Sequence, residues 1–166
     1  MPGVSSYFDA CYRREASRTD ATVGIRDDGR LAFTTPETAG ADVAVKNPAR
    51  RDVQFTPVDH NIIVWNDRGE EQSQCDGMLY VKETEELVFV EIKDQQKKWI
   101  LEAEEQLEST IAHFRTLHDT AAFRHRSAYA ANRQHPHFNY SQKDRCIAFR
   151  NRTGFRLNIV NRIALK

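Results

Sequence analysis

Two acidic residues and a lysine stand at the ends of two neighbouring apolar segments, a placement that suits metal-assisted chemistry. Asp76 precedes the segment Gly77–Val81, and Glu91 and Lys93 close the segment that begins at Leu87. Two carboxylates can share one hard cation such as Mg²⁺. An ammonium group beside that cation would lie near a phosphate that the metal polarises. The residue types therefore indicate a cation site that can act on a phosphate group.

These residues face one another if the two segments form a hairpin. A turn centred on Thr84–Glu85 would place Asp76 opposite Lys93 and Met78 opposite Glu91, so that one cation lies within reach of both acids. Side chains alternate between the faces of a strand. One face then carries Asp76, Met78, Tyr80, Phe89, Glu91 and Lys93, and the other is an apolar core face with Leu79, Val81, Val88, Val90 and Ile92. The alternative is a surface hairpin whose charges form ordinary cross-strand ion pairs.

An amphipathic helix is predicted directly after this hairpin. Apolar residues recur at spacings of three and four, which is the period of a helix with one buried stripe. The stripe consists of Ile100, Ala103, Leu107, Ile111, Phe114 and Leu117. Glu102, Glu105 and Glu108 lie off the stripe, so they are expected to face solvent or a basic partner.

This order of elements resembles the PD-(D/E)xK nuclease superfamily, and the resemblance runs from Val58 to Leu117. An aspartate begins one strand, Glu-x-Lys ends the next, and an amphipathic helix follows. The resemblance implies an α/β fold of the restriction-endonuclease-like type, with a mixed central sheet flanked by helices. Cys75 stands where the family motif often has proline. The family sometimes uses a supporting acid as well, for which Glu15 and Asp59 are both candidates.

The resemblance also assigns roles to the motif residues. Asp76 and Glu91 match the motif acids, and Lys93 matches the lysine that positions or activates the attacking water. The core helix of the family often presents a glutamine to the site, and Gln106 is the candidate here. The implied cofactor is Mg²⁺, with Mn²⁺ as a substitute, held by Asp76, Glu91 and the backbone carbonyl of Ile92.

The remaining segments predict further elements of a single domain spanning residues 1–166. A helix is expected at Ser5–Arg18, and a hairpin of residues 22–26 and 30–35 is expected around Asp28–Gly29. Further strands are expected at 58–65, 127–131, 144–150 and 155–165. The domain would then consist of a helix and a variable insertion (1–53), a motif-bearing core (54–123) and basic C-terminal strands (124–166).

The net charge of zero conceals two oppositely charged regions. Residues 54–123 carry 6 basic and 15 acidic side chains, whereas residues 124–166 carry 10 basic side chains and one acidic side chain. The basic region also contains aromatic residues, among them Tyr129, Phe138 and Tyr140. Cations neutralise phosphates and aromatic rings stack on bases, so this region predicts a nucleic-acid-binding face with Arg124, Arg126, Arg133 and Arg150. The alternative is that the basic region packs against the acidic helix of the same chain, and both can hold at once.

Several other classes of protein are not supported by the sequence. There is no apolar run of about 20 residues and no secretory signal. Three dispersed cysteines without a CxxC pair argue against a disulfide scaffold or a zinc site, so the expected location is the cytoplasm. No nucleophile elbow or phosphate-binding glycine loop occurs, and the six histidines show no metal-ligating spacing.

Taken together, these patterns predict a Mg²⁺-dependent endonuclease that hydrolyses phosphodiester bonds of DNA or RNA, with DNA the favoured partner and a role in defence, repair or restriction. The alternative is a catalytically inactive module of the same fold that binds nucleic acid or a protein partner, for example in a toxin–immunity system. No membrane association is expected. The oligomeric state is left open, with a homodimer as one option.

Overall fold

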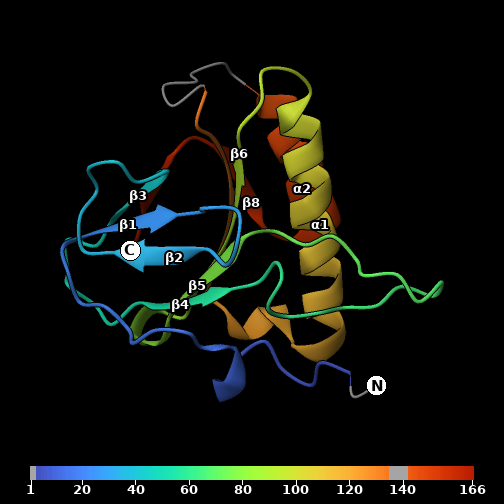
Figure 1. Cartoon of the computed structure of the whole chain (residues 1–166), viewed down its shortest axis with the longest axis horizontal. Helices are drawn as coiled ribbons and strands as arrows, with labels where there is room; N and C mark the ends of the chain where they lie inside the picture. The colour runs from blue at the N-terminus through green and yellow to red at the C-terminus, as the bar shows by residue number, and fades with distance from the viewer. Residues whose placement is uncertain (1–2, 135–141) are drawn as a thin grey trace.

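The computed structural model describes residues 3–134 and 142–166, and its elements stack in three layers (Figure 1). The central layer is a five-stranded sheet in the order β4-β5-β6-β7-β8, formed by Gln54–Pro57, Gly77–Val81, Glu86–Lys93, His125–Asn132 and Arg156–Ile159. The second layer is a four-stranded sheet in the order β2-β1-β3-β9, formed by Phe33–Thr35, Thr22–Arg26, Val43–Lys46 and Arg162–Ala164. The third layer contains helices α1 (Trp99–Leu117) and α2 (Lys143–Thr153).

Both sheets are mixed, and this mixture sets where the strand ends meet. In the five-stranded sheet, β4, β5 and β6 pair antiparallel, whereas β6, β7 and β8 pair parallel. The carboxyl ends of β6 and β7 therefore lie together at one edge, where Lys93 pairs with Asn132. The four-stranded sheet is antiparallel except for the parallel pair of β3 and β9. The prediction of an α/β fold with a mixed sheet is confirmed.

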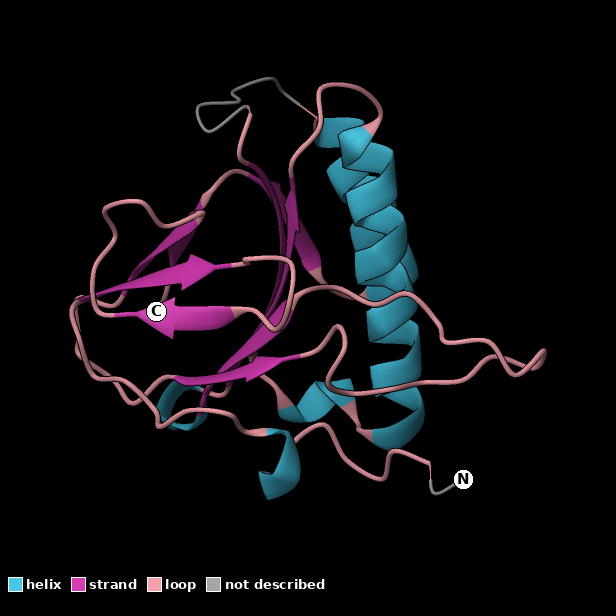
Figure 2. Cartoon of the chain, in the orientation of Figure 1, coloured by secondary structure: helices cyan, strands magenta, loops and turns pink. Residues whose placement is uncertain are grey.

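The helices cover one face of the central sheet only, as the colouring of Figure 2 makes clear. The α1 stripe packs on that face together with Met78 and Phe89. Helices were predicted to flank the central sheet, and for its other face this is wrong. That face packs against the four-stranded sheet. Alternating apolar residues explain this sandwich, because Val23, Ile25, Val43 and Val45 all point at the central sheet and are buried. The apolar face predicted from Leu79, Val81, Val88, Val90 and Ile92 is confirmed as part of this second core.

The β5–β6 hairpin forms with a register that differs from the prediction. Gly77 lies opposite Val90 and Met78 lies opposite Phe89, rather than opposite Glu91. The connection is the 3-10 turn Lys82–Thr84 followed by Glu85 in the left-handed conformation, which brings Glu86 into the strand. Each residue of β5 is therefore paired with a residue of β6 two positions earlier than predicted. Because side chains alternate between the two faces, a shift by two residues leaves each side chain on its predicted face.

Two predicted elements in the first half of the chain are wrong. In place of the helix at Ser5–Arg18 there is only a single 3-10 turn, Ala10–Tyr12. This segment lies on the end of α1, where the ring of Tyr7 is fully buried against Phe114, and that tertiary packing outweighs the local helical pattern. The strand expected at 58–65 is a turn, and β4 (Gln54–Pro57) precedes it instead. Asn61 holds the turn, since its side chain donates to the carbonyl of Pro57.

Part of the basic C-terminal region is helical rather than extended. The strand predicted at 144–150 is helix α2, which ends at Gly154 in the left-handed conformation with its N–H bonded to the carbonyl of Arg150. A short apolar run does not distinguish strand from buried helix. Contacts with α1 decide the outcome, because Phe149 enters the core.

The other strands predicted outside the β5–β6 hairpin have the following outcomes. The strand expected at 155–165 is divided between the two sheets, as β8 and β9. The strand at 127–131 and the hairpin of 22–26 with 30–35 are confirmed.

The contact between the N-terminal segment and α1 should respond to pH. The backbone N–H of Tyr7 donates to Nε2 of His118 at 3.1 Å, and burial lowers the pKa of His118. Protonation of His118 would turn Nε2 into a donor that faces the N–H of Tyr7, which is also a donor. The folded protein therefore binds a proton at His118 less readily than the unfolded chain does. The stability of the fold should then decrease as the pH drops below about 6.5. A lost backbone hydrogen bond costs about 1 kcal/mol, or roughly 2–4 °C in melting temperature.

A melting curve at pH 7.5 and at pH 5.5 checks this expectation. His118→Gln keeps an acceptor that does not titrate, so its pH-dependent loss should be smaller than that of the parent. His60→Gln, at an exposed histidine outside this contact, is the control. Equal losses in the parent and in His118→Gln would contradict the assignment.

Candidate functional site

Asp76 is fixed at the start of β5 by two backbone contacts. Its Oδ2 accepts a hydrogen bond from the N–H of Ile92 at 2.7 Å, across the end of β6. Its carbonyl accepts from the N–H of Val58 at 2.9 Å. In the observed register Asp76 lies just past the pair Gly77–Val90, so it points towards Glu91. The predicted position directly opposite Lys93 is wrong, because the whole hairpin register has moved by two residues.

Glu91 is a buried carboxyl group at the centre of the site. Only 2% of the residue is exposed, and its carboxyl group is hydrogen-bonded to that of Asp76. Its Oε2 lies 3.6 Å from Nζ of Lys93 and has no hydrogen-bond partner among the residues that the structure describes. A buried polar atom without a partner is costly, so this oxygen is available to a ligand that enters the site.

Lys93 is held from the helix side by a chain of polar groups. Its Nζ donates to Oε1 of Gln106 on α1. The amide Nε2 of Gln106 in turn donates to the hydroxyl of Ser73 at 3.0 Å. The stripe residue Leu107 is fully buried, so Gln106 lies at the edge of the helix–sheet contact, where it reaches the strand end. The prediction that Asp76, Glu91, Lys93 and Gln106 come together is thus met by the geometry.

Burial makes this carboxyl pair difficult to ionise. Desolvation raises the pKa of Glu91 well above its usual range, and the hydrogen bond and charge of Asp76 raise it further, while Lys93 acts in the opposite direction. Desolvation also raises the pKa of Asp76, although the hydrogen bonds from Glu91 and Ile92 oppose that shift. Two carboxyl groups in contact, with one oxygen unpartnered, suit a hard divalent cation in place of a proton. The donor set therefore fits Mg²⁺ or Mn²⁺.

Of the two candidate supporting acids, only Asp59 lies near the site. Its charge raises the pKa values of both Asp76 and Glu91. Asp59, His60 and Glu71 also bring ligand-type atoms within 4.8 Å of one another, a grouping that sequence spacing did not indicate. Glu15 is used elsewhere, because its carboxylate accepts hydrogen bonds from the N–H and the hydroxyl of Thr34.

The backbone of Ile92 is engaged at the site through its N–H, which binds Asp76, and its side chain belongs to the sheet–sheet core. The metal contact expected for its carbonyl stays a prediction.

Two residues that border the site, Ser73 and Thr110, were missed by sequence reasoning. The hydroxyl of Thr110 accepts a hydrogen bond from the backbone N–H of Cys75 at 2.8 Å, and this bond fixes the chain next to Asp76. Single polar residues in a loop or on a helix carry no spacing signal that could have identified them.

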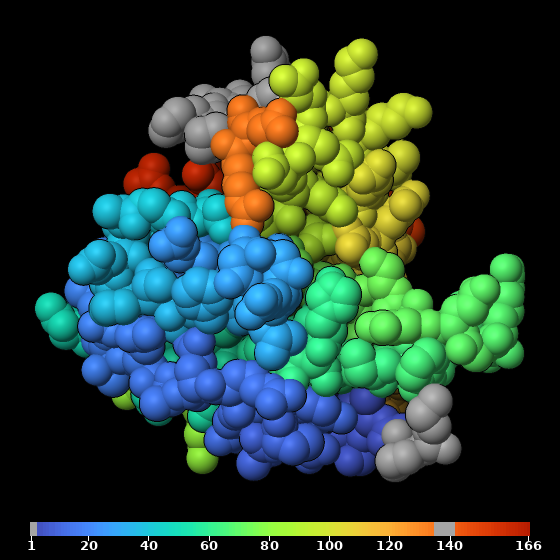
Figure 3. Space-filling view, viewed as in Figure 1, coloured from blue at the N-terminus to red at the C-terminus, as the bar shows by residue number. Residues whose placement is uncertain are grey.

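The four arginines predicted to bind nucleic acid do not form one surface. Arg124, Arg126 and Arg150 line one pocket. Arg133 lies elsewhere, at the carboxyl end of β7, and is paired with Asp42 at 2.7 Å and with Asp94 at 3.6 Å. Its hydrogen bond to Asp42 raises the pKa of its guanidinium group. Figure 3 shows the end of β7, in orange, wedged between the four-stranded sheet and the start of α1. Arg133 is therefore engaged by acids of the protein itself, and its role in nucleic-acid binding stays a prediction.

The alternative interpretation of the basic region also holds in part. Arg145 and Arg152 on α2 form ion pairs with Glu104, which is buried on α1, and Arg152 also pairs with Glu108 at 2.9 Å. These contacts bind the basic helix to the acidic one. Phe138 and Tyr140 lie outside the described residues. Tyr129 is buried in the core between the sheets rather than open for stacking on a base.

Comparison of the chain with protein-family models, with curated proteins and with solved structures finds no match. The resemblance to the PD-(D/E)xK superfamily therefore stays a prediction that rests on the motif residues. No helix in the described part of the chain is both long enough and apolar enough to cross a membrane.

Replacing Glu91 by glutamine should separate metal binding from folding. The neutral amide removes a buried acid, so Glu91→Gln should melt at the same temperature as the parent or higher in EDTA. The parent should gain about 2.7 kcal/mol at a free Mn²⁺ concentration 100-fold above Kd, or roughly 5–10 °C, and Glu91→Gln should lose that gain. Glu37→Gln, at an exposed position outside the site, is the matched control and should respond like the parent. An unchanged Mn²⁺ response in Glu91→Gln would remove this residue from the ligand set.

Proposed function

We propose that the protein is a metal-dependent endonuclease of the restriction-endonuclease-like type that hydrolyses phosphodiester bonds in nucleic acid, DNA rather than RNA. The observation that supports this most is the convergence of Asp76, Glu91, Lys93 and Gln106 near the ends of β5 and β6. Within the described residues, Oε2 of Glu91 has Lys93 at 3.6 Å and no hydrogen-bond partner. Two acids can hold the metal ion and a lysine can stabilise phosphoryl charge, and the resemblance to the PD-(D/E)xK superfamily adds the helix-borne glutamine to this set.

Each residue has a distinct role in this proposal. Asp76 and Glu91 bind the cation, which supplies Lewis-acid stabilisation of the phosphoryl charge when bound. Lys93 directs its N–H groups at the attacking water and at a phosphoryl oxygen, where negative charge grows in the transition state. Gln106 is a positioning residue, because it acts through its hydrogen bond to Lys93. Asp59 adds negative charge near the acids and so favours a divalent cation at the site.

The setting of the site is consistent with a cytoplasmic enzyme of defence, repair or restriction. Cys11, Cys75 and Cys146 are all free thiols, which a reducing compartment preserves. An open groove borders the site, lined by Ser73, Lys93, Glu102, Glu105, Gln106 and nearby residues. This groove gives a phosphate group direct access to the ammonium of Lys93.

One observation favours a second candidate function, a catalytically inactive module that binds nucleic acid or a protein. Lys93 and Gln106 line the groove, but neither Asp76 nor Glu91 does, and Glu91 is almost completely buried. A cation would have to displace the contact between the two carboxyl groups to reach both. If the carboxyl pair only holds the strand ends together, the protein will bind no divalent ion and cleave nothing.

Replacing Lys93 by alanine tests the catalytic proposal. The carboxylates remain, so Mn²⁺ binding should persist, but the transition state loses its cationic partner. Single-turnover cleavage of labelled DNA with Mg²⁺ should slow by on the order of 100-fold or more, with little change in substrate binding. Lys97→Ala, an exposed lysine in the same connection, is the control and should cleave like the parent. RNA and EDTA samples run in parallel decide the substrate class and the metal requirement.

A Lys93→Ala protein that cleaves as fast as the parent would falsify the role assigned to this lysine. If the parent cleaves neither DNA nor RNA with Mg²⁺ or Mn²⁺, the inactive module is the better description.

A further inference from the structure

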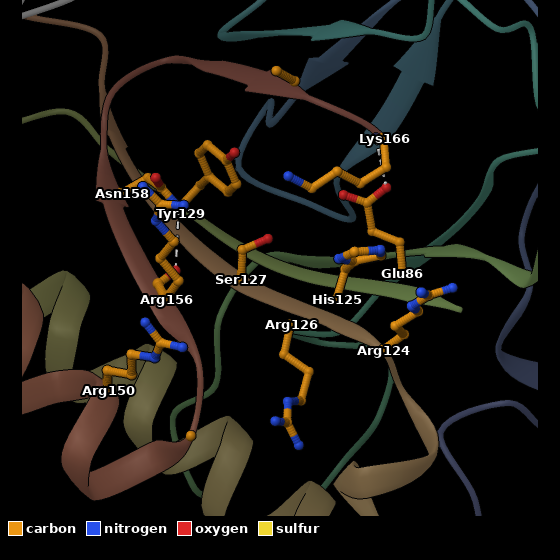
Figure 4. Close-up of a pocket in the computed structure, with 12 residues that line it drawn as sticks. Glu86, Arg124, His125, Arg126, Ser127, Tyr129, Arg150, Arg156, Asn158 and Lys166 are labelled. Atoms are coloured by element: carbon orange, nitrogen blue, oxygen red, sulfur yellow. Dashed lines mark hydrogen bonds between the residues drawn. The ribbon is translucent and has the colours of Figure 1, made fainter. Parts of the chain in front are cut away.

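A second pocket lies at the other end of the central sheet. It is bordered by the start of β7, the start of β8, the last turn of α2 and the C-terminal residue Lys166 (Figure 4). The register of β6 and β7 fixes its distance from the candidate metal site. Glu86 pairs with His125 at the pocket end, and Lys93 pairs with Asn132 at the site end, seven residues later. At about 3.3 Å per residue the two places are about 23 Å apart.

The pocket has a large excess of positive charge. Five cationic side chains line it, Arg124, Arg126, Arg150, Arg156 and Lys166, together with His125. Glu86 is the single acidic residue in the lining, and burial raises its pKa while its Oε1 accepts the backbone N–H of Lys166. The local charge is therefore about +4 even when Glu86 is ionised.

The four arginines of this lining lack an acidic partner in the described part of the chain, and Arg126 donates to the backbone carbonyl of Thr120 at 3.0 Å. Within residues 3–134 and 142–166, none of Arg124, Arg126, Arg150 and Arg156 forms an ion pair with a carboxylate. Arg133, Arg145 and Arg152, by contrast, each bind one or more acids. Clustered like charges repel one another and destabilise the fold. An arrangement that leaves four arginines unpaired around one cavity is best explained by an anion that binds there.

Two hydroxyl groups add neutral donors to the lining, those of Tyr129 and of Ser127, which lies near the centre of the labelled residues in Figure 4. Asn158 also lines the pocket, but its amide donates to the carbonyls of Ala128 and Arg156. Burial raises the pKa of Tyr129, so its hydroxyl stays protonated. The cavity measures about 230 Å³, below the roughly 300–1,000 Å³ of pockets that enclose drug-sized ligands. It therefore has room for a small anionic group, and the remainder of a larger ligand would stay outside.

We propose that this pocket binds a phosphate group that carries more than one negative charge, either the terminal phosphate of a nucleic-acid strand or the phosphate chain of a nucleotide. A carboxylate or an internal phosphodiester offers a single charge, whereas a phosphate monoester carries about −1.5 to −2 at pH 7. Guanidinium groups match the geometry of phosphate oxygens with paired N–H groups. The pocket lies about 23 Å from Lys93, so the phosphate bound there is not the one proposed to be cleaved. The proposal is thus independent of the nuclease activity.

Binding measured in EDTA, where no metal-dependent cleavage occurs, tests the proposal. One probe is a 12-nucleotide single-stranded DNA with a 3′ fluorophore, prepared with a 5′-phosphate and with a 5′-hydroxyl. The second probe is ATP, used as an unlabelled competitor. The test variant is Arg150→Gln/Arg156→Gln, in which both side chains are exposed and neither makes a hydrogen bond among the described residues. Arg30→Gln/Arg68→Gln, two exposed arginines outside the pocket, changes the net charge equally and is the control.

The affinity of the parent and of the control for the preferred probe should exceed that of the test variant by about tenfold or more. This difference corresponds to a binding free energy of at least about 1.4 kcal/mol. The salt dependence of binding should fall by about one unit of slope for each phosphate contact removed. A preference for the 5′-phosphate identifies a strand end as the ligand, and competition by ATP without such a preference identifies a nucleotide. Asp76→Asn changes the candidate metal site and not this pocket, so it should bind both probes with the affinity of the parent. Phosphate binding is thereby tested separately from nuclease activity.

Equal affinity of the test variant and the control for both probes would overturn the proposal. The same conclusion follows if the parent neither prefers the 5′-phosphate nor responds to ATP. A melting curve of each variant confirms that the proteins compared are folded.

Discussion

Burial of β6 on both faces is the constraint on which the rest of the structure depends. All residues of this strand except Lys93 are buried, with α1 on one side and the four-stranded sheet on the other. An apolar strand of this kind is stable only when both layers are present. The same burial carries Glu91 into a poorly solvated position at the strand end, where its carboxyl group contacts that of Asp76. The core that stabilises the fold thereby also creates the electrostatic conditions of the candidate site.

A buried carboxyl pair is a cost to stability unless something compensates for it. The protein provides only part of that compensation, through the N–H of Ile92 and the more distant ammonium of Lys93. The unpartnered oxygen of Glu91 indicates that the site is arranged for a ligand rather than for stability alone. The chain from Lys93 through Gln106 to Ser73 fixes the lysine beside Glu91, so that one ammonium group partly balances two acids.

The basic C-terminal region serves three separate purposes. Arg145 and Arg152 tie α2 to the acidic face of α1, and Arg133 links the end of β7 to Asp42 and Asp94. Within the described residues, Arg124, Arg126, Arg150 and Arg156 at the opposite edge of the central sheet form no ion pair. An overall charge count therefore overstates the surface available to a polyanion, since much of the positive charge is consumed by the protein's own acids.

The sequence alone determined the features with a strong local period. The alternation in Gly77–Val81 and Leu87–Ile92 identified two strands and their faces, and the spacing from Ile100 to Leu117 identified α1, because these patterns follow directly from strand and helix geometry. Tertiary structure decided the rest. The turn conformation at Glu85 set the register, packing on α1 made 143–153 a helix and left the N-terminal segment without one, and ion pairs placed Arg133 against Asp42 and Asp94. The register depends on the backbone conformation of one turn residue, which strand periodicity does not determine. The other outcomes depend on contacts between residues distant in the chain, and local spacing carries no information about such contacts.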